Sequence, residues 1–167
     1  MNLNEIKLRK KIKALIAFFI VGLVISGVTA FPLEWELFVL VDVCKTLFAA
    51  NNPLLEWTLK VYTGLQATYN NYPFIAYGTD WLAFAHLVIA VVFIGPLRDP
   101  VKNVWVIQFG IIACLMVFPL ALIAGQLRGI PFFWRLIDCA FGAMGIIPLV
   151  ICNSYIKRLT QLTHIKL

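Results

Sequence analysis

Long apolar segments alternate with short polar ones along this chain, and the alternation predicts its class of fold. The apolar segments cover residues 14–31, 77–97, 104–127 and 132–156. Each is close to or above the ~20 residues that an α-helix needs to cross the ~30 Å hydrocarbon core of a bilayer. The pattern predicts an all-α fold, a membrane-embedded four-helix bundle that forms a single integral membrane domain over residues 1–167.

The one sizeable loop, residues 32–76, has a pattern of its own. Pro53 opens a stretch in which positions recur at spacings of three and four, as in a helix, namely Leu54, Thr58, Val61, Leu65 and Tyr69. Aromatic side chains favour the membrane–water boundary, and this loop contains Trp35, Trp57, Tyr62 and Tyr72. We therefore expect short interfacial helices in the loop between the first two spans.

Prolines predict where some helices begin, end and bend. Gly95-Pro96 is expected to end the second span. Asp99 followed by Pro100 is typical of a helix start, with Asp99 as the N-cap and Pro100 in the first helical position. Pro119 lies inside the third span and predicts a kink there.

The first apolar segment has two interpretations. The basic residues before it, the apolar stretch itself and the ending Val28-Thr29-Ala30 also fit a cleavable signal peptide. We expect instead a helix that is retained as a signal anchor, with the basic lead-in setting its orientation.

The positive charge predicts an orientation in the membrane. The net charge is +6, with 14 Lys and Arg residues. With a cytoplasmic N-terminus, four spans leave Lys45, Lys60, Arg128 and Arg135 outside and every other basic residue inside. Because basic residues favour the cytoplasmic side, we expect both termini in the cytoplasm and a bacterial inner membrane as the location. Nucleic acid is not an expected partner, since basic clustering would be its only support.

Small and polar residues recur at helical spacing in each span. In the third span they are Gly110, Cys114, Val117, Ala121 and Gly125, and in the fourth they are Arg135, Asp138, Gly142 and Gly145. Helices in lipid associate through close backbone approach and polar contacts, so these stripes are the expected contact faces.

Three polar residues inside the spans form the candidate site. Charged groups at the membrane centre cost ~2.5–3.5 kcal/mol on insertion scales, so His86, Arg135 and Asp138 should face the bundle interior. The second and fourth spans both enter from outside, which brings the three to the outer half of the bundle. Gln126 and Arg128 approach the same level, and Asp80 is expected at the rim.

A structural alternative explains the same residues. Arg135 and Asp138 are three positions apart and can form an ion pair within one helix that lets both enter the bilayer. His86 would then only donate a hydrogen bond between helices. We expect no cofactor and no metal: His86 is the only histidine within a span, no span contains a lysine, and no Cys-x-x-Cys pair occurs.

Three runs of sequence resemble a bacterial four-span membrane family that has no assigned function. They are residues 77–81 (Tyr-Gly-Thr-Asp-Trp), 95–100 (Gly-Pro-Leu-Arg-Asp-Pro) and 129–138 (Gly-Ile-Pro-Phe-Phe-Trp-Arg-Leu-Ile-Asp). The resemblance implies the four-span architecture and no chemistry. A weaker, architectural likeness connects the chain with the EXPERA sterol-isomerase and sterol-binding proteins. That likeness implies a lipid ligand, although the first span lacks the acidic residue of those proteins.

The leading hypothesis is a membrane protein that binds a small hydrophobic or lipid-like ligand in an outer-half polar pocket formed by His86, Arg135 and Asp138. The rivals are a non-catalytic accessory subunit of a membrane complex, in which these groups only hold helices together, and a small oligomeric transporter. The bilayer is the expected partner, and a homo-oligomer or larger complex stays open. No residue pattern decides whether the protein is an enzyme.

Overall fold

The computed structural model describes residues 3–164, and within that range the chain is helical with no strand. Four of its helical segments are long and apolar enough to cross a membrane: Leu3–Thr29, Pro73–Arg98, Val104–Leu127 and Phe132–Thr163. At most 28% of the most apolar window of each segment is buried inside the chain. Because so much apolar surface faces outward, the chain is a multi-pass membrane protein and not a water-soluble bundle.

The chain forms two compact units, and the boundaries between them fall inside two helices. Unit 1 contains residues 1–22 and 89–167, and unit 2 contains residues 23–88. The helix α1 (Leu3–Thr29) and the helix α4 (Ala76–Val92) each contribute to both units. The predicted domain also includes residues 1–2 and 165–167, which lie outside the described residues.

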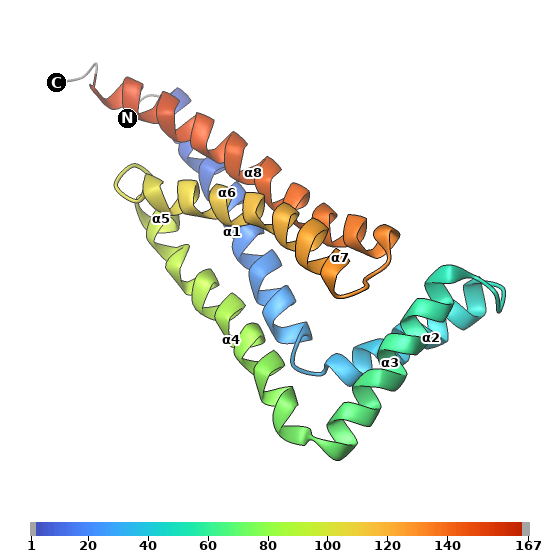
Figure 1. Cartoon of the computed structure of the whole chain (residues 1–167). Coiled ribbons are helices and arrows are strands. Elements are labelled where there is room, and N and C mark those ends of the chain that lie inside the picture. The colour runs from blue at the N-terminus through green and yellow to red at the C-terminus, as the bar shows by residue number, and fades with distance from the viewer. Residues whose placement is uncertain (1–2, 165–167) are drawn as a thin grey trace. The chain divides into compact units, whose positions relative to one another are not determined.

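Unit 1 contains part of every span and is a bundle of four helices. Besides the larger, N-terminal part of α1 and the end of α4, it holds α5 (Ile94–Arg98), α6 (Val104–Pro119), η2 (Leu120–Ala124), α7 (Gly125–Leu127) and α8 (Phe132–His164). Figure 1 shows α6 running antiparallel to α8, the most extensive helix pair in the chain. The core side chains are fully buried and branched or aromatic, among them Ile12, Ile16, Phe93, Ile107 and Leu149.

Glycines let α6 and α8 approach closely, as the small-residue stripes predict. A Cβ atom added at Gly142 would lie 2.9 Å from the Cys114 carbonyl oxygen, and one at Gly145 would lie 2.7 Å from Cys114 Sγ. A Cβ at Gly110 would lie 2.7 Å from the buried ring of Phe93. Such separations leave no room for a side chain, so these positions fix the distance between the helices.

Unit 2 is built around an antiparallel helix pair in the loop between the first two spans. The helix α2 (Leu33–Leu47) packs against α3 (Pro53–Asn71), and the short η1 (Pro73–Ile75) leads from α3 into α4. Leu37, Val41 and Cys44 face the pair's small core at spacings of four and three. The prediction that a helix begins at Pro53 is confirmed, and the Asn52 side chain caps it by accepting a hydrogen bond of 2.9 Å from the Leu54 N–H.

Two helices extend beyond the predicted apolar segments, and one begins later than the sequence predicts. The helix α1 already begins at Leu3, because the basic lead-in continues the helix, and α8 extends to His164. The helix α6 begins at Val104, not at Pro100. Asp99 therefore caps a turn instead of a helix: its Oδ1 accepts a 3.2 Å hydrogen bond from the Lys102 N–H, and its carboxylate lies 3.8 Å from Lys102 Nζ.

At Pro119, where the sequence predicts a kink, the α-helix changes into a π-helical turn. Proline lacks the N–H that would continue the α-helical ladder. The next five residues form η2, in which the Gly125 N–H donates to the Leu120 carbonyl five positions earlier. A π-helical turn leaves carbonyl groups that need other donors, and a residue of the candidate site supplies one of them.

Candidate functional site

Arg135 is a link between α8 and the π-helical turn. Its Nη1 donates a 3.2 Å hydrogen bond to the Leu122 carbonyl in η2. The aliphatic stem crosses over Gly125, where an added Cβ would lie 2.8 Å from Arg135 Cδ. The guanidinium carbon is 5.3 Å from the centre of the Phe132 ring, within cation–π range. The residue thus holds the end of the third span against the start of the fourth.

The expected ion pair between Arg135 and Asp138 is not formed. The guanidinium turns to a carbonyl of the π-helical turn instead, and the Arg135 Nε is a buried donor with no hydrogen-bond partner. Asp138 is half-buried, and no hydrogen bond or ion pair joins its carboxylate to any residue between 3 and 164. One turn of α8 therefore carries an anchored cation and a carboxylate without a partner in the described chain.

Gln126 and Arg128 lie at the end of the third span beside the Arg135 link. Gln126 is in α7, and Arg128 is the residue that caps its C-terminus. Both side chains are exposed, and neither forms a side-chain hydrogen bond within the described residues. Gly129 follows with a φ of +70°, which glycine adopts without strain, and so closes the turn toward α8.

His86 and Asp80 belong to the part of α4 that lies in unit 2. His86 Nδ1 is 2.8 Å from the Leu82 carbonyl oxygen. A carbonyl only accepts hydrogen bonds, so this contact favours the tautomer with the proton on Nδ1 and leaves Nε2 as an acceptor. Asp80 is half-buried and lines a shallow hollow of about 240 Å³ together with Tyr77, Trp81 and Phe84.

The six candidate residues therefore fall into two groups. Asp80 and His86 lie in unit 2, and Gln126, Arg128, Arg135 and Asp138 lie in unit 1. Within unit 1, Arg135 meets the third span through Leu122 and Gly125. The meeting of His86 with Arg135 and Asp138 stays a prediction.

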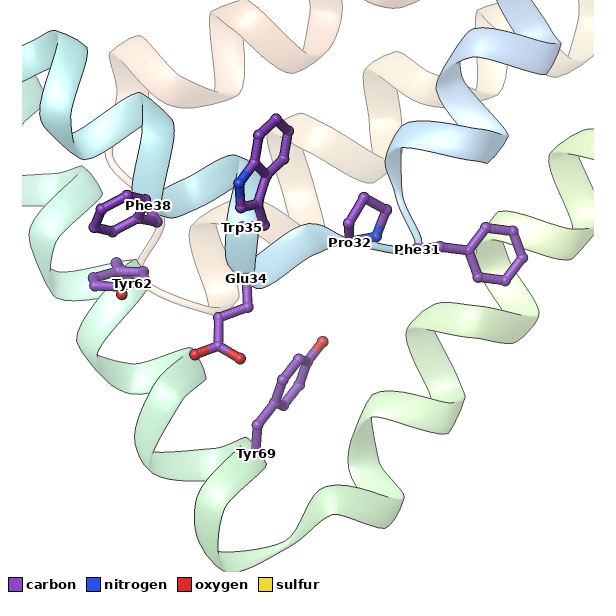
Figure 2. Close-up of a pocket in the computed structure, with 7 residues that line it drawn as sticks. All are labelled: Phe31, Pro32, Glu34, Trp35, Phe38, Tyr62 and Tyr69. Atoms are coloured by element: carbon purple, nitrogen blue, oxygen red, sulfur yellow. The ribbon is translucent and has the colours of Figure 1, made fainter.

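A pocket that the sequence did not predict lies inside unit 2. It has a volume of about 450 Å³ and is formed by the α1–α2 turn, α2 and α3 (Figure 2), with the lining residues Phe31, Pro32, Glu34, Trp35, Phe38, Tyr62 and Tyr69. The aromatic residues were visible in the sequence as residues typical of an interface. Only the packing of α2 on α3 shows that they line one pocket together with a carboxylate.

No group of three or more His, Cys, Asp or Glu residues placed to hold a metal ion occurs among residues 3–164. No protein-family model, curated protein or solved structure matches the chain.

Proposed function

We propose that this multi-pass membrane protein binds a small hydrophobic or lipid-like ligand through polar side chains of its spans, chiefly Asp138, Arg135 and His86. The spans would place these groups in the outer half of a bacterial inner membrane, with both termini in the cytoplasm. Asp80, Gln126 and Arg128 would line the rim. The ligand's polar head would enter from the outer leaflet.

One observation supports the proposal most directly: Asp138 lies in the most buried span and has no partner in the described chain. Placing a carboxylate in hydrocarbon costs ~2.5–3.5 kcal/mol of insertion free energy unless a cation pairs with it or a donor forms a hydrogen bond to it. Arg135, the nearest candidate by sequence, is bound to the Leu122 carbonyl. A hydroxyl or amine of a ligand is a donor of the kind that Asp138 lacks.

The other two groups supply complementary chemistry. The Nε–H of Arg135 is a buried donor without a partner, so it suits a ligand oxygen. The Nε2 of His86 is an acceptor once Nδ1 donates to Leu82, so it suits a ligand hydroxyl. A ligand with a small polar head and an apolar body would satisfy all three groups and leave its body among the apolar spans.

Native mass spectrometry of the full chain in mild detergent tests the proposal. We expect a small molecule to remain bound to the wild-type protein and to be lost from the Asp138→Asn and His86→Ala variants. The control variant, Asp99→Asn, changes the same functional group in a turn outside the spans and should retain the molecule. If both site variants keep it at the wild-type level, the proposal fails. If a second protein is retained in its place, the chain is an accessory subunit.

A further inference from the structure

The unpredicted pocket of unit 2 combines one carboxylate with a wall of aromatic rings. Glu34 lies in the first turn of α2, and its side chain is half-buried. Figure 2 shows its carboxylate pointing from α2 toward α3, between the rings of Tyr62 and Tyr69. Phe38 and Tyr62 form a ring pair with centroids 6.2 Å apart, which joins the two helices at one end of the pocket.

No side chain of the described chain neutralises this carboxylate. Glu34 forms no ion pair and accepts no hydrogen bond from residues 3–164. The one cation–π contact of unit 2 involves a different pair, Lys60 and Trp57. The N-terminus of α2 has no side-chain cap, and its free N–H groups favour a negative charge nearby. The N-terminus of α2 thus stabilises the negative charge of Glu34, and the carboxylate remains available to a ligand.

The hydroxyl group of Tyr69, on the pocket wall, has a fixed role that favours a ligand that donates. Thr79 Oγ1 lies 2.7 Å from the Ala76 carbonyl and so uses its only proton there. Tyr69, whose hydroxyl is 3.2 Å from the same Oγ1, must then be the donor of that hydrogen bond. The Tyr69 hydroxyl proton is therefore not available to Glu34, and its oxygen keeps an acceptor site.

The surrounding charge also suits a cation. Unit 2 contains five acidic residues and two lysines, which gives a net charge of −3 in a chain whose total is +6. Aromatic rings attract a cation over their faces, and attraction to a carboxylate adds to this effect. A carboxylate beside aromatic rings is therefore an arrangement that suits an organic ammonium group.

We propose that the pocket bounded by Glu34, Trp35, Phe38, Tyr62 and Tyr69 binds an organic ammonium group. The volume of about 450 Å³ admits a group the size of choline or ethanolamine. The pocket is formed by the loop helices and shares no residue with the proposed function, so the two proposals are independent. The ammonium group has two sources, a lipid head group or a free cation.

The test is a binding titration of the purified full chain in a maltoside detergent. Choline is the cationic probe, and 3,3-dimethylbutan-1-ol, which has the same shape without the charge, is the neutral one. We expect choline to bind at least about tenfold more tightly than the neutral probe. The Glu34→Gln variant should lose that preference. The Glu36→Gln variant, which changes the same group two residues along α2 outside the pocket lining, should keep it.

A second pair of variants separates the role of the ring from that of the hydroxyl. Tyr69→Phe keeps the ring and should retain choline binding, whereas Tyr69→Leu should weaken it by about fivefold to tenfold. Circular dichroism of each variant shows whether α2 and α3 still form. Equal affinity for the two probes in the wild-type protein, or an unchanged preference in a folded Glu34→Gln variant, would overturn the proposal.

Competition identifies the source of the ammonium group. If short-chain phosphatidylcholine displaces choline and short-chain phosphatidylglycerol does not, the pocket binds a lipid head group. If neither lipid displaces choline, the ligand is a free cation. Neither result depends on Asp138 or His86. A failure of this titration therefore leaves the proposed ligand site in the spans untouched, and a failure of that site leaves the ammonium pocket untouched.

Discussion

The close approach of α6 and α8 predicts a large effect of one methyl group at Gly142. An alanine Cβ there would lie 2.9 Å from the Cys114 carbonyl oxygen and 3.2 Å from Val117 Cβ. Ordinary contact begins near 3.4 Å, so the two helices would have to separate by roughly 0.5 Å. The first contact is with backbone, which cannot turn aside as a flexible side chain can.

The expected cost follows from two opposing terms. Overpacking a well-packed core costs about 1–3 kcal/mol. Replacing glycine by alanine inside a helix returns about 0.5–1 kcal/mol. We expect Gly142→Ala to lower the free energy of unfolding by about 1–2 kcal/mol. Gly22, in α1, has no atom within 4 Å of its added Cβ, so Gly22→Ala should leave the protein as stable or slightly more stable.

The assay is reversible unfolding in mixed micelles, with the fraction of sodium dodecyl sulfate raised stepwise and helicity followed by circular dichroism. Gly142→Ala should unfold at a lower dodecyl sulfate fraction than the wild-type protein, and Gly142→Val at a lower fraction still. Should Gly142→Ala prove as resistant as Gly22→Ala, the carbonyl of Cys114 is not in contact with α8, and the account of how the bundle packs is wrong.

Two further predictions follow from the fold. Replacing Arg135 by methionine removes its hydrogen bond to the π-helical turn, so the melting temperature should fall by an amount equivalent to roughly 1–2 kcal/mol. The control variant Arg128→Met, at an exposed position without a partner in the described residues, should melt like the wild type. If both variants melt at the same temperature, Arg135 does not stabilise the contact between α8 and the π-helical turn. In a protein whose native cysteines are replaced, a cysteine at position 60 should react with a membrane-impermeant maleimide added outside intact cells, because Lys60 is expected outside. A cysteine at position 102 should react only after the cells are lysed. Labelling of position 102, and not of position 60, in intact cells would contradict the proposed orientation.

Much of the fold could be predicted because apolar length is a strong signal. The third span, Val104–Leu127, has the predicted bounds, and the α3 start was marked by Pro53 and by the helical spacing after it. Helices were expected in the loop, but the bounds of α2 were not predicted, although Leu37, Val41 and Cys44 already had the spacing of a buried helical face. Most of the other residues of α2 are apolar too, so the sequence shows no clear contrast between a buried apolar face and an exposed polar face.

The candidate site was harder to predict because its partners are not visible in the sequence. Arg135 and Asp138 have the spacing of an ion pair, and the sequence offers Arg135 no better partner. The partner it has is the Leu122 carbonyl, which lies in a π-helical turn that the sequence did not predict. The pocket around Glu34 likewise depends on how α2 meets α3, which connects residues some thirty positions apart.

The π-helical turn has a consequence for how this chain can change in length. A π-helical turn is equivalent to one extra residue inserted into an α-helix. Deleting a single residue between Leu120 and Ala124 would restore a regular helix and leave the residues after it on the same face, because the π-helical turn absorbs the extra residue. Gly125 would then stay beneath the stem of Arg135. A homologue that is one residue shorter here should therefore keep a glycine at the position of Gly125, and the third span can lose one residue at this point without losing its contact with the fourth.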